Sequence, residues 1–274
     1  MKRFLTGALL TLTLIAGFFL REIDYKIFDV LVLTSAIICS VEFNNALGDR
    51  TSKTQKILSI IFTPIAFLVA VFIKKSLFTV IFVYAFCTLI FSAMQENSKA
   101  IDKIANYLLS LFYPTVPILF LSLINQMGSF SLFALVITFA TTTATDTYAY
   151  FVGSKLKGKK LCEKISPNKT ISGAIGGLIG GIVTGVLVYY AFKLFGASPF
   201  EGAGEASVLA FVIISSMLSS IVTQVGDLFE SSIKRSLGIK DMGNLLPGHG
   251  GMLDRIDGLM FNAMAVYLCY ALLV

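Results

Sequence analysis

The chain has 274 residues, of which 56% are hydrophobic and only 14% are charged. A soluble domain carries about 25% charged residues, so this composition is typical of a protein that lies in a bilayer. The single histidine, His249, excludes a His-rich zinc site and a di-iron carboxylate–histidine bundle. The four cysteines are scattered without a CxxC pair, so neither a disulfide framework nor a zinc ribbon is indicated.

Apolar runs of about 20 residues, the length that a helix needs to cross a bilayer core, recur along the chain. They predict an all-α, polytopic membrane protein with about nine transmembrane helices. These are approximately Phe4 to Leu20, Ile27 to Val41, Ile57 to Ile73, Leu77 to Met94, Ile104 to Ile124, Phe130 to Val152, Ile171 to Phe195, Ala206 to Val225 and Ile256 to Val274. Although Lys2 and Arg3 precede the first run as in a secretory signal, no A-x-A-like site follows before Arg21, so a retained anchor is favoured.

The runs group into two regions. Residues 1–129 form a predicted N-terminal scaffold, and residues 130–274 form a predicted catalytic region with cytoplasmic loops at 153–170 and 226–255. The Phe-rich first half shows no cluster of polar groups and is interpreted mainly as scaffold. Four glycines recur at every fourth position of the seventh run, at Gly173, Gly177, Gly181 and Gly185. No GK[ST] follows them, so close helix packing is favoured over a phosphate-binding loop.

The positions of the 22 basic residues predict the topology. With nine spans, 17 of them lie on the side of the N-terminus and 5 on the other side. By the positive-inside rule, this bias predicts a cytoplasmic N-terminus. The net charge of +6 is then a consequence of topology and does not indicate a nucleic-acid partner.

Four carboxylates are predicted to lie close to one face of the membrane. An intramembrane charge costs at least about 2.5–3.5 kcal/mol on insertion scales, so such residues point to function. Asp146 and Asp227 each precede the first cation of their loop by about two helical turns, which places them at similar depth. Asp254 and Asp257 lie three residues apart, on one helical face at the start of the last run. All four are candidates for a cation site.

The segment between the eighth and ninth runs combines acids, cations and glycines. Asp227, Ser231 and Lys234 fall at positions i, i+4 and i+7, so they share a face if the helix continues. The glycines on either side of His249 allow unusual backbone conformations and let N–H groups approach a ligand. Hard carboxylate oxygens suit Mg²⁺, which proteins hold with one or two carboxylates together with phosphate oxygens and water. The combination indicates a phosphate-rich substrate.

This segment resembles the C-terminal signature of the phosphatidate cytidylyltransferase, or CDP-diacylglycerol synthase, family. Every fixed position of the signature is filled, by Ser231, Lys234, Arg235, Lys240, Asp241, His249, Gly250, Gly251, Asp254, Arg255 and Asp257. A second block is also similar to the family, with Asp146, Ala149, Tyr150, Gly153, the run Lys164-Ile165-Ser166-Pro167-Asn168-Lys169-Thr170, and Gly173. Two positions depart from it: Tyr148 replaces a small residue, which would reshape a pocket wall, and Ile171 replaces a tryptophan.

The resemblance implies transfer of CMP from CTP to phosphatidic acid, which gives CDP-diacylglycerol and diphosphate, at the cytoplasmic face of the inner membrane. The phosphate of phosphatidic acid is already ionised near neutral pH, so catalysis needs charge neutralisation and alignment more than a base. We predict Asp227 and Asp254 as ligands of Mg²⁺, with Asp146 and Asp257 completing or tuning the site and a second cation left open. The resemblance also implies a homodimer surrounded by membrane lipids.

The predicted site residues form two groups. The predicted catalytic residues are Asp227, Lys234, Arg235, Lys240, Asp241, His249, Asp254, Arg255 and Asp257. The predicted substrate-binding residues are Asp146, Tyr150, Ser166, Lys169, Thr170, Ser231, Gly250 and Gly251.

Some of these residues also have plainer interpretations. Lys234 and Arg235 suit inside-positive anchors, Asp257 suits a helix cap, and His249 suits a residue that shapes its loop. The lysines between Lys155 and Lys169 suit attraction to anionic lipid headgroups, except Lys169 itself, which belongs to the second block.

Two other functions compete with the cytidylyltransferase. A CTP-dependent lipid or polyprenol kinase shares part of the carboxylate and lysine pattern but would release CDP. An ion-coupled transporter would bind a cation at Asp146 and Asp227 near the midplane of the membrane. No inverted repeat is visible in the sequence and the carboxylates gather toward one face, so the transporter is disfavoured.

Overall fold

The computed structural model describes residues 2–72, 81–83, 85–86, 90, 100–200 and 202–272. The chain forms two compact units. Unit 1 comprises Met1–Leu123 and Leu237–Arg255, and unit 2 comprises Ile124–Ser236 and Ile256–Val274. The segment Leu237–Arg255 therefore packs with the N-terminal helices, although the predicted division at residue 129 assigned it to the C-terminal region.

The helices confirm an all-α, polytopic membrane protein. Among the described residues, seven helical segments are long and apolar enough to cross a membrane: Thr6–Ile23, Tyr25–Ala46, Lys53–Val71, Ile104–Asn125, Gly128–Leu156, Ile171–Leu194 and Glu205–Leu237. The predicted run from Leu77 to Met94 lies largely outside the described residues. The last predicted run corresponds to helix α10, Leu253–Ala271. The total of nine spans stays a prediction.

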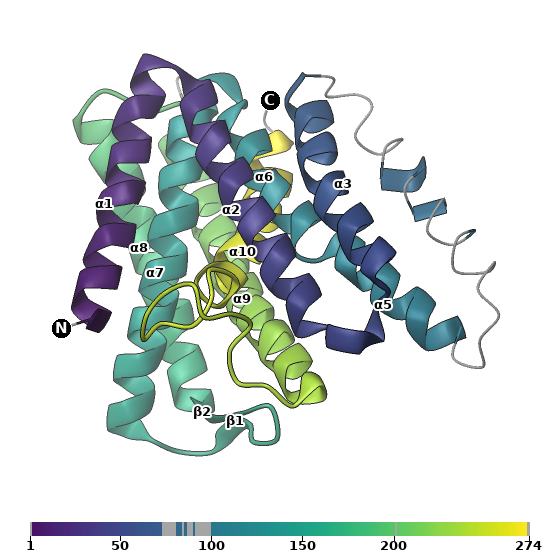
Figure 1. The fold of residues 1–274 in the computed structure, drawn as a ribbon. Helices are drawn as coiled ribbons and strands as arrows, with labels where there is room; N and C mark the ends of the chain where they lie inside the picture. The colour runs from purple at the N-terminus through teal and green to yellow at the C-terminus, as the bar shows by residue number, and fades with distance from the viewer. Residues whose placement is uncertain are drawn as a thin grey trace. The chain divides into compact units, whose positions relative to one another are not determined.

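Unit 1 contains α1 (Lys2–Ile23), α2 (Tyr25–Ala46), a 3₁₀ turn η1 (Gly48–Arg50), α3 (Lys53–Phe72), α5 (Ala100–Phe112) and most of α6 (Thr115–Asn125) (Figure 1). Buried hydroxyl pairs join α3 to α5 and α6: Ser59 with Ser110 at 3.0 Å and Thr63 with Thr115 at 2.9 Å. The predicted single run from Ile104 to Ile124 is broken between α5 and α6, where Pro114 supplies no backbone N–H.

Unit 2 contains a 3₁₀ turn η3 (Gly128–Phe130), α7 (Ser131–Leu156), β1 (Lys160–Cys162), β2 (Ser166–Thr170), α8 (Ile171–Leu194), most of α9 (Glu205–Leu237) and α10 from Ile256 onward. The two strands pair antiparallel and form a small hairpin between α7 and α8 (Figure 1). This hairpin lies inside the segment 153–170, which was predicted as a loop without further detail. The Oγ1 of Thr170 accepts the N–H of Gly173 at 3.1 Å and so caps the start of α8.

The glycines of α8 lie where neighbouring helices approach closely, which confirms the packing interpretation. A Cβ on Gly181 would lie 1.8 Å from the Oγ of Ser220 in α9, and one on Gly177 would lie 2.8 Å from the backbone oxygen of Thr145 in α7. Only a hydrogen at these positions lets the three helices pack at this distance. The hydroxyls of Thr145 and Ser220 hydrogen bond to each other at 3.0 Å beside Gly181.

Helix α9 continues for twelve residues past the predicted end of its apolar run at Val225. The predicted loop 226–255 is therefore wrong at its start, because residues 226–237 are helical. Hydropathy falls at Asp227, but the residues that follow are compatible with a helix, and α9 ends only before Gly238, whose φ of +72° is typical of a helix terminator. The irregular segment is thus 238–252, and α10 begins at Leu253.

Candidate active site

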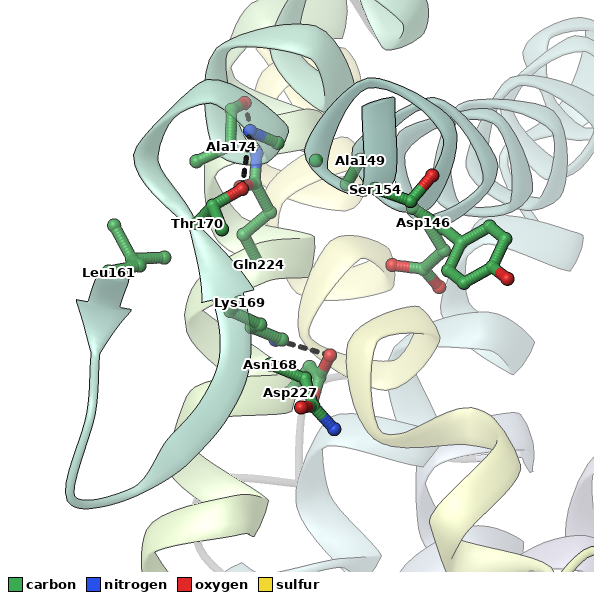
Figure 2. Close-up of a pocket in the computed structure, with 13 residues that line it drawn as sticks. Asp146, Ala149, Ser154, Leu161, Asn168, Lys169, Thr170, Ala174, Gln224 and Asp227 are labelled. Atoms are coloured by element: carbon green, nitrogen blue, oxygen red, sulfur yellow. Dashed lines mark hydrogen bonds and ion pairs between the residues drawn. The ribbon is translucent and has the colours of Figure 1, made fainter. Parts of the chain in front are cut away.

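A cavity of about 490 Å³ in unit 2 is lined by residues from α7, β1, β2, α8 and α9. Five predicted site residues line it: Asp146, Tyr150, Lys169, Thr170 and Asp227. Figure 2 shows the carboxylates of Asp146 and Asp227 on neighbouring helices, with Lys169 reaching in from the hairpin. Residues of the second block and Asp227 therefore line one cavity. This agrees with the similar depth predicted for Asp146 and Asp227.

Lys169 and Asp227 form an ion pair inside this cavity (Figure 2). Their side chains are 26% and 31% exposed, so the pair is partly open to a ligand. The hydroxyl of Ser231 donates to Oδ1 of Asp227 at 3.4 Å, one helical turn further along α9. The helical face that was predicted for Asp227 and Ser231 is therefore present.

Close backbone contact between α7 and α8 forms the wall beside this ion pair. A Cβ on Gly153 would lie 3.3 Å from the Cα of Gly173 and 2.9 Å from the Oγ1 of Thr170. On the α9 side, the amide of Gln224 donates to the backbone oxygen of Ala174 at 3.3 Å. Thr170 is predicted to bind substrate; in the structure its hydroxyl caps α8 at the edge of the cavity.

A buried acid that the sequence analysis missed lies one turn away from Asp227. Glu230 is fully buried, and its Oε2 accepts the ammonium of Lys234 at 2.6 Å. Among the described residues, its other carboxylate oxygen, Oε1, is buried without a hydrogen-bond partner. The spacing of Glu230 four residues before Lys234 was the available signal. Lys234 is only 12% exposed, which disfavours its interpretation as a surface anchor.

Asp257 does not cap the last helix, because α10 begins four residues earlier at Leu253. Its Oδ1 accepts the N–H of Gly258 at 2.8 Å. Arg235, also in unit 2, is exposed and donates from Nε to the backbone oxygen of Ile165 at 3.3 Å, just before the predicted substrate residue Ser166. Arg235 therefore ties the end of α9 to the hairpin.

The remaining predicted residues lie in the part of unit 1 from Leu237 to Arg255, which we call the glycine-rich segment. Oδ2 of Asp254 accepts the N–H groups of Met242 and Gly251, each at 2.8 Å. Gly250 has a φ of +83°, and its carbonyl accepts the N–H of Leu246 at 2.9 Å, which closes a turn around His249. The backbone amides of Met242, Leu246 and Gly251 thus hydrogen bond within the protein.

Of the polar residues around that turn, Arg255 hydrogen bonds to its backbone. Arg255 donates from Nε to the carbonyl of His249 at 3.0 Å. Within the part of the chain that the structure describes, Nδ1 of His249 is buried without a hydrogen-bond partner. Lys240 and Asp241 are exposed, and a Cβ on Gly250 would lie 3.3 Å from the Cβ of Asp241.

The two predicted principal metal ligands fall in different units, Asp227 in unit 2 and Asp254 in unit 1, so their joint role stays a prediction. Among the described residues, no group of three or more His, Cys, Asp or Glu side chains is arranged to hold a metal ion. Asp146 and Asp227 nevertheless line one cavity. This donor set fits Mg²⁺, which is commonly held by one or two carboxylates while substrate phosphates and water supply the other ligands.

Tyr148, the bulky departure from the family pattern, does not line this cavity. Its ring packs on Gly180, where a Cβ would lie 2.4 Å from ring atoms, and it borders a separate apolar groove of about 430 Å³ between α7 and α8. The expected change in a pocket wall therefore concerns that groove and leaves the carboxylate cavity untouched.

Comparison with known proteins supports a single family. The model of the cytidylyltransferase family matches residues 1–273. Phosphatidate cytidylyltransferase of Brucella abortus is 38% identical over 195 residues, which cover 71% of this chain and 66% of the relative. The enzymes of the same name from Helicobacter pylori (strain 26695) and Bacillus subtilis are 36% and 30% identical, with 66% and 67% of this chain covered. These matches span 63% and 64% of the two relatives, so the chain aligns with just under two-thirds of each relative's length. The chain belongs to the cytidylyltransferase family.

Proposed function

We propose that the protein is a nucleotidyltransferase that transfers CMP from CTP to phosphatidic acid and yields CDP-diacylglycerol and diphosphate. The observation that carries this proposal is the cavity of unit 2, where Asp146, Asp227 and Lys169 meet although they are distant in the sequence. Membership of the cytidylyltransferase family and the names of the relatives agree with this chemistry.

In the proposed reaction, an oxygen of the lipid phosphate attacks the α-phosphorus of CTP. A new P–O bond forms, the bond to the β-phosphate oxygen breaks, and diphosphate leaves with the bonding electron pair. The attacking oxygen carries negative charge near neutral pH, so no side chain has to remove a proton. The protein therefore has to bring two anions together and align them, which is a task for cationic side chains at fixed positions.

The residues that perform this task are those of the cavity and its rim. The ammonium of Lys169, paired with Asp227, lies within reach of any phosphate that a cation on Asp227 would hold. Asp146 and Asp227 would hold Mg²⁺, which neutralises phosphate charge when bound; Asp254, Asp257 and a second cation stay further predictions. Lys234 and Arg235 lie on the same helix as Asp227 and would bind phosphate groups beside it.

We further propose that the site faces the cytoplasm and that the protein is a homodimer. The distribution of basic residues, 17 against 5, supports the orientation. The variant Lys164→Cys, made in a chain whose four native cysteines are replaced, tests the orientation. In intact cells its thiol should be protected from a membrane-impermeant maleimide until the cells are lysed. Light scattering of the detergent complex measures the oligomeric state.

The activity is tested by incubating the purified, detergent-solubilised protein with CTP labelled in the cytidine, phosphatidic acid and Mg²⁺. Formation of a labelled lipid together with diphosphate is expected. Release of CDP with a lipid alcohol as acceptor would instead identify a CTP-dependent kinase. Cation uptake into proteoliposomes without any nucleotide reaction would identify a transporter.

A further inference from the structure

A buried carboxylate of the N-terminal half contacts the glycine-rich segment directly. Glu42 lies in α2 of unit 1 and is only 8% exposed. Its Oε1 accepts the N–H of Met252 at 3.0 Å, and its Oε2 accepts the N–H of Leu253 at 2.9 Å. The sequence analysis interpreted the first half mainly as scaffold and did not single out Glu42.

Two glycines of the same segment pack against this carboxylate. A Cβ on Gly243 would lie 2.5 Å from Oε1 of Glu42, and one on Gly251 would lie 2.6 Å from Oε2. Real Cβ atoms do not come so close to a neighbouring oxygen, so both positions require the absence of a side chain. Glu42 thus occupies a space that the backbone of residues 243–253 encloses within unit 1.

These contacts supply hydrogen-bond partners for the backbone N–H groups at the start of α10. The first N–H groups of a helix have no partner within it, and the helix dipole favours a negative charge at that end. Glu42 accepts two of these N–H groups, from Met252 and Leu253. Asp254, which follows Leu253, accepts the N–H groups of Gly251 and Met242. Two carboxylates therefore hold four backbone N–H groups of one short segment.

We propose that Glu42 is a positioning residue that fixes the carboxylate of Asp254 and the turn from His249 to Gly251. It acts through the backbone of Met252 and Leu253, which connects the turn to Asp254. The role in catalysis rests on the proposed function and on Asp254 as a ligand of Mg²⁺. The anchoring of the segment does not depend on either.

The test compares Glu42→Gln and Glu42→Asp with the wild type. The amide of Gln carries no negative charge and presents a donor to an N–H, whereas Asp keeps the charge on a shorter stem. In Glu42→Gln, hydrogen exchange at Met252 and Leu253 should accelerate by about tenfold, since a hydrogen bond to a charged group is lost. The Mg²⁺ concentration for half-maximal cytidylyl transfer should rise by a similar factor, and Glu42→Asp should lie between Gln and the wild type.

Two further variants separate positioning from general stability. Asp29→Asn makes the same acid-to-amide change at another buried residue of α2 and should leave both the Mg²⁺ requirement and exchange at Met252 unchanged. Gly243→Ala presses a methyl group against Glu42 without removing its charge and should reproduce the effects of Glu42→Gln. The test therefore stays valid if Glu42→Gln does not fold.

Wild-type exchange and a wild-type Mg²⁺ requirement in both Glu42→Gln and Gly243→Ala would overturn the proposal. If Asp29→Asn changes the Mg²⁺ requirement and the exchange at Met252 as much as Glu42→Gln does, Glu42 contributes only to general stability. That outcome would also overturn the proposal. If the wild type itself transfers no CMP while exchange accelerates in Glu42→Gln, the proposed function fails and the anchoring role of Glu42 stands.

Discussion

Asp227 of unit 2 has a different kind of partner from Glu42 and Asp254 of unit 1. In unit 1, Glu42 and Asp254 accept backbone N–H groups, which cannot leave unless the segment 242–253 refolds. In unit 2, Asp227 pairs with Lys169, whose ammonium sits on a flexible stem of four carbons. A lysine can move from a carboxylate to a phosphate by rotation of its side chain. The comparison indicates that acids of unit 1 shape the backbone, whereas Asp227 is able to exchange its partner for a ligand.

Asp227→Asn tests the carboxylate that can exchange Lys169 for a ligand, and it should have the largest effect on turnover. The amide keeps the size of the side chain but removes the charge that pairs with Lys169 and would hold Mg²⁺. We expect turnover to fall by about 10²–10³, with a thermal unfolding midpoint close to that of the wild type, because a partly exposed ion pair contributes little stability. Turnover and unfolding are measured on the same purified sample.

The matched control is Glu205→Gln, an acid-to-amide change on the same helix in an exposed pair with Lys193. It should keep wild-type turnover. Near wild-type turnover of Asp227→Asn at low Mg²⁺ would show that the metal assignment is wrong.

Asp254→Asn tests the acids that hold the backbone of unit 1 and should affect both activity and stability. Oδ2 of Asp254 accepts two backbone N–H groups, so the loss of charge weakens both hydrogen bonds. We expect a loss of turnover of at least about tenfold together with a lower unfolding midpoint and faster exchange at Met242 and Gly251. If Asp254→Asn and Asp227→Asn have the same unfolding midpoint and exchange, the difference between the two units does not hold.

Lys169→Ala removes the cation that Asp227 would release to a phosphate. The expected result is a rise of about tenfold in the KM for CTP with a smaller change in kcat, which corresponds to one lost contact to a phosphate. Steady-state kinetics at saturating phosphatidic acid measure both parameters, with Lys193→Ala as a control on an exposed lysine of α8. An unchanged KM would exclude Lys169 from nucleotide binding.

Thr170→Ala should have the smallest effect, because this residue lines the cavity but its hydroxyl bonds to backbone. Loss of a helix cap lowers the free energy of unfolding by about 1 kcal/mol, and Thr170→Ser should restore it. Thermal unfolding monitors the change, and turnover should stay close to that of the wild type. A large loss of turnover without loss of stability would show that the hydroxyl contacts substrate.

Most of the helices and the two aspartates of the cavity could be predicted from the sequence, because apolar length and residue spacing indicate them. Tyr150, Lys169 and Thr170 came from the resemblance to the family. Asp146 and Asp227 were placed at similar depth by counting residues from the nearest cation, and the structure brings them to one cavity. The glycines of α8 were assigned to packing from their period of four and from the absence of a following GK[ST], and the structure confirms this assignment.

Glu42 could not be found in this way, because its partners lie about 210 positions away and are backbone groups, which carry no sequence signal. The end of α9 was missed for a different reason. Hydropathy reports where the apolar run ends, whereas the helix ends where the backbone meets a residue such as Gly238 that terminates it. Glu230 was overlooked because it lies past the end of the apolar run, where hydropathy gives no sign that a side chain is buried.

The length of α9 bears on how two very different substrates would meet. Its 33 residues extend for about 50 Å, well beyond a hydrocarbon core of about 30 Å. The apolar part ends at Val225, so Asp227 and the residues after it lie at the level of the lipid headgroups when the apolar part fills the core. A lipid phosphate already resides at that level. A water-soluble nucleotide could therefore reach it there while the acyl chains remain among their neighbours, and no energy need be spent on lifting the lipid out of the bilayer.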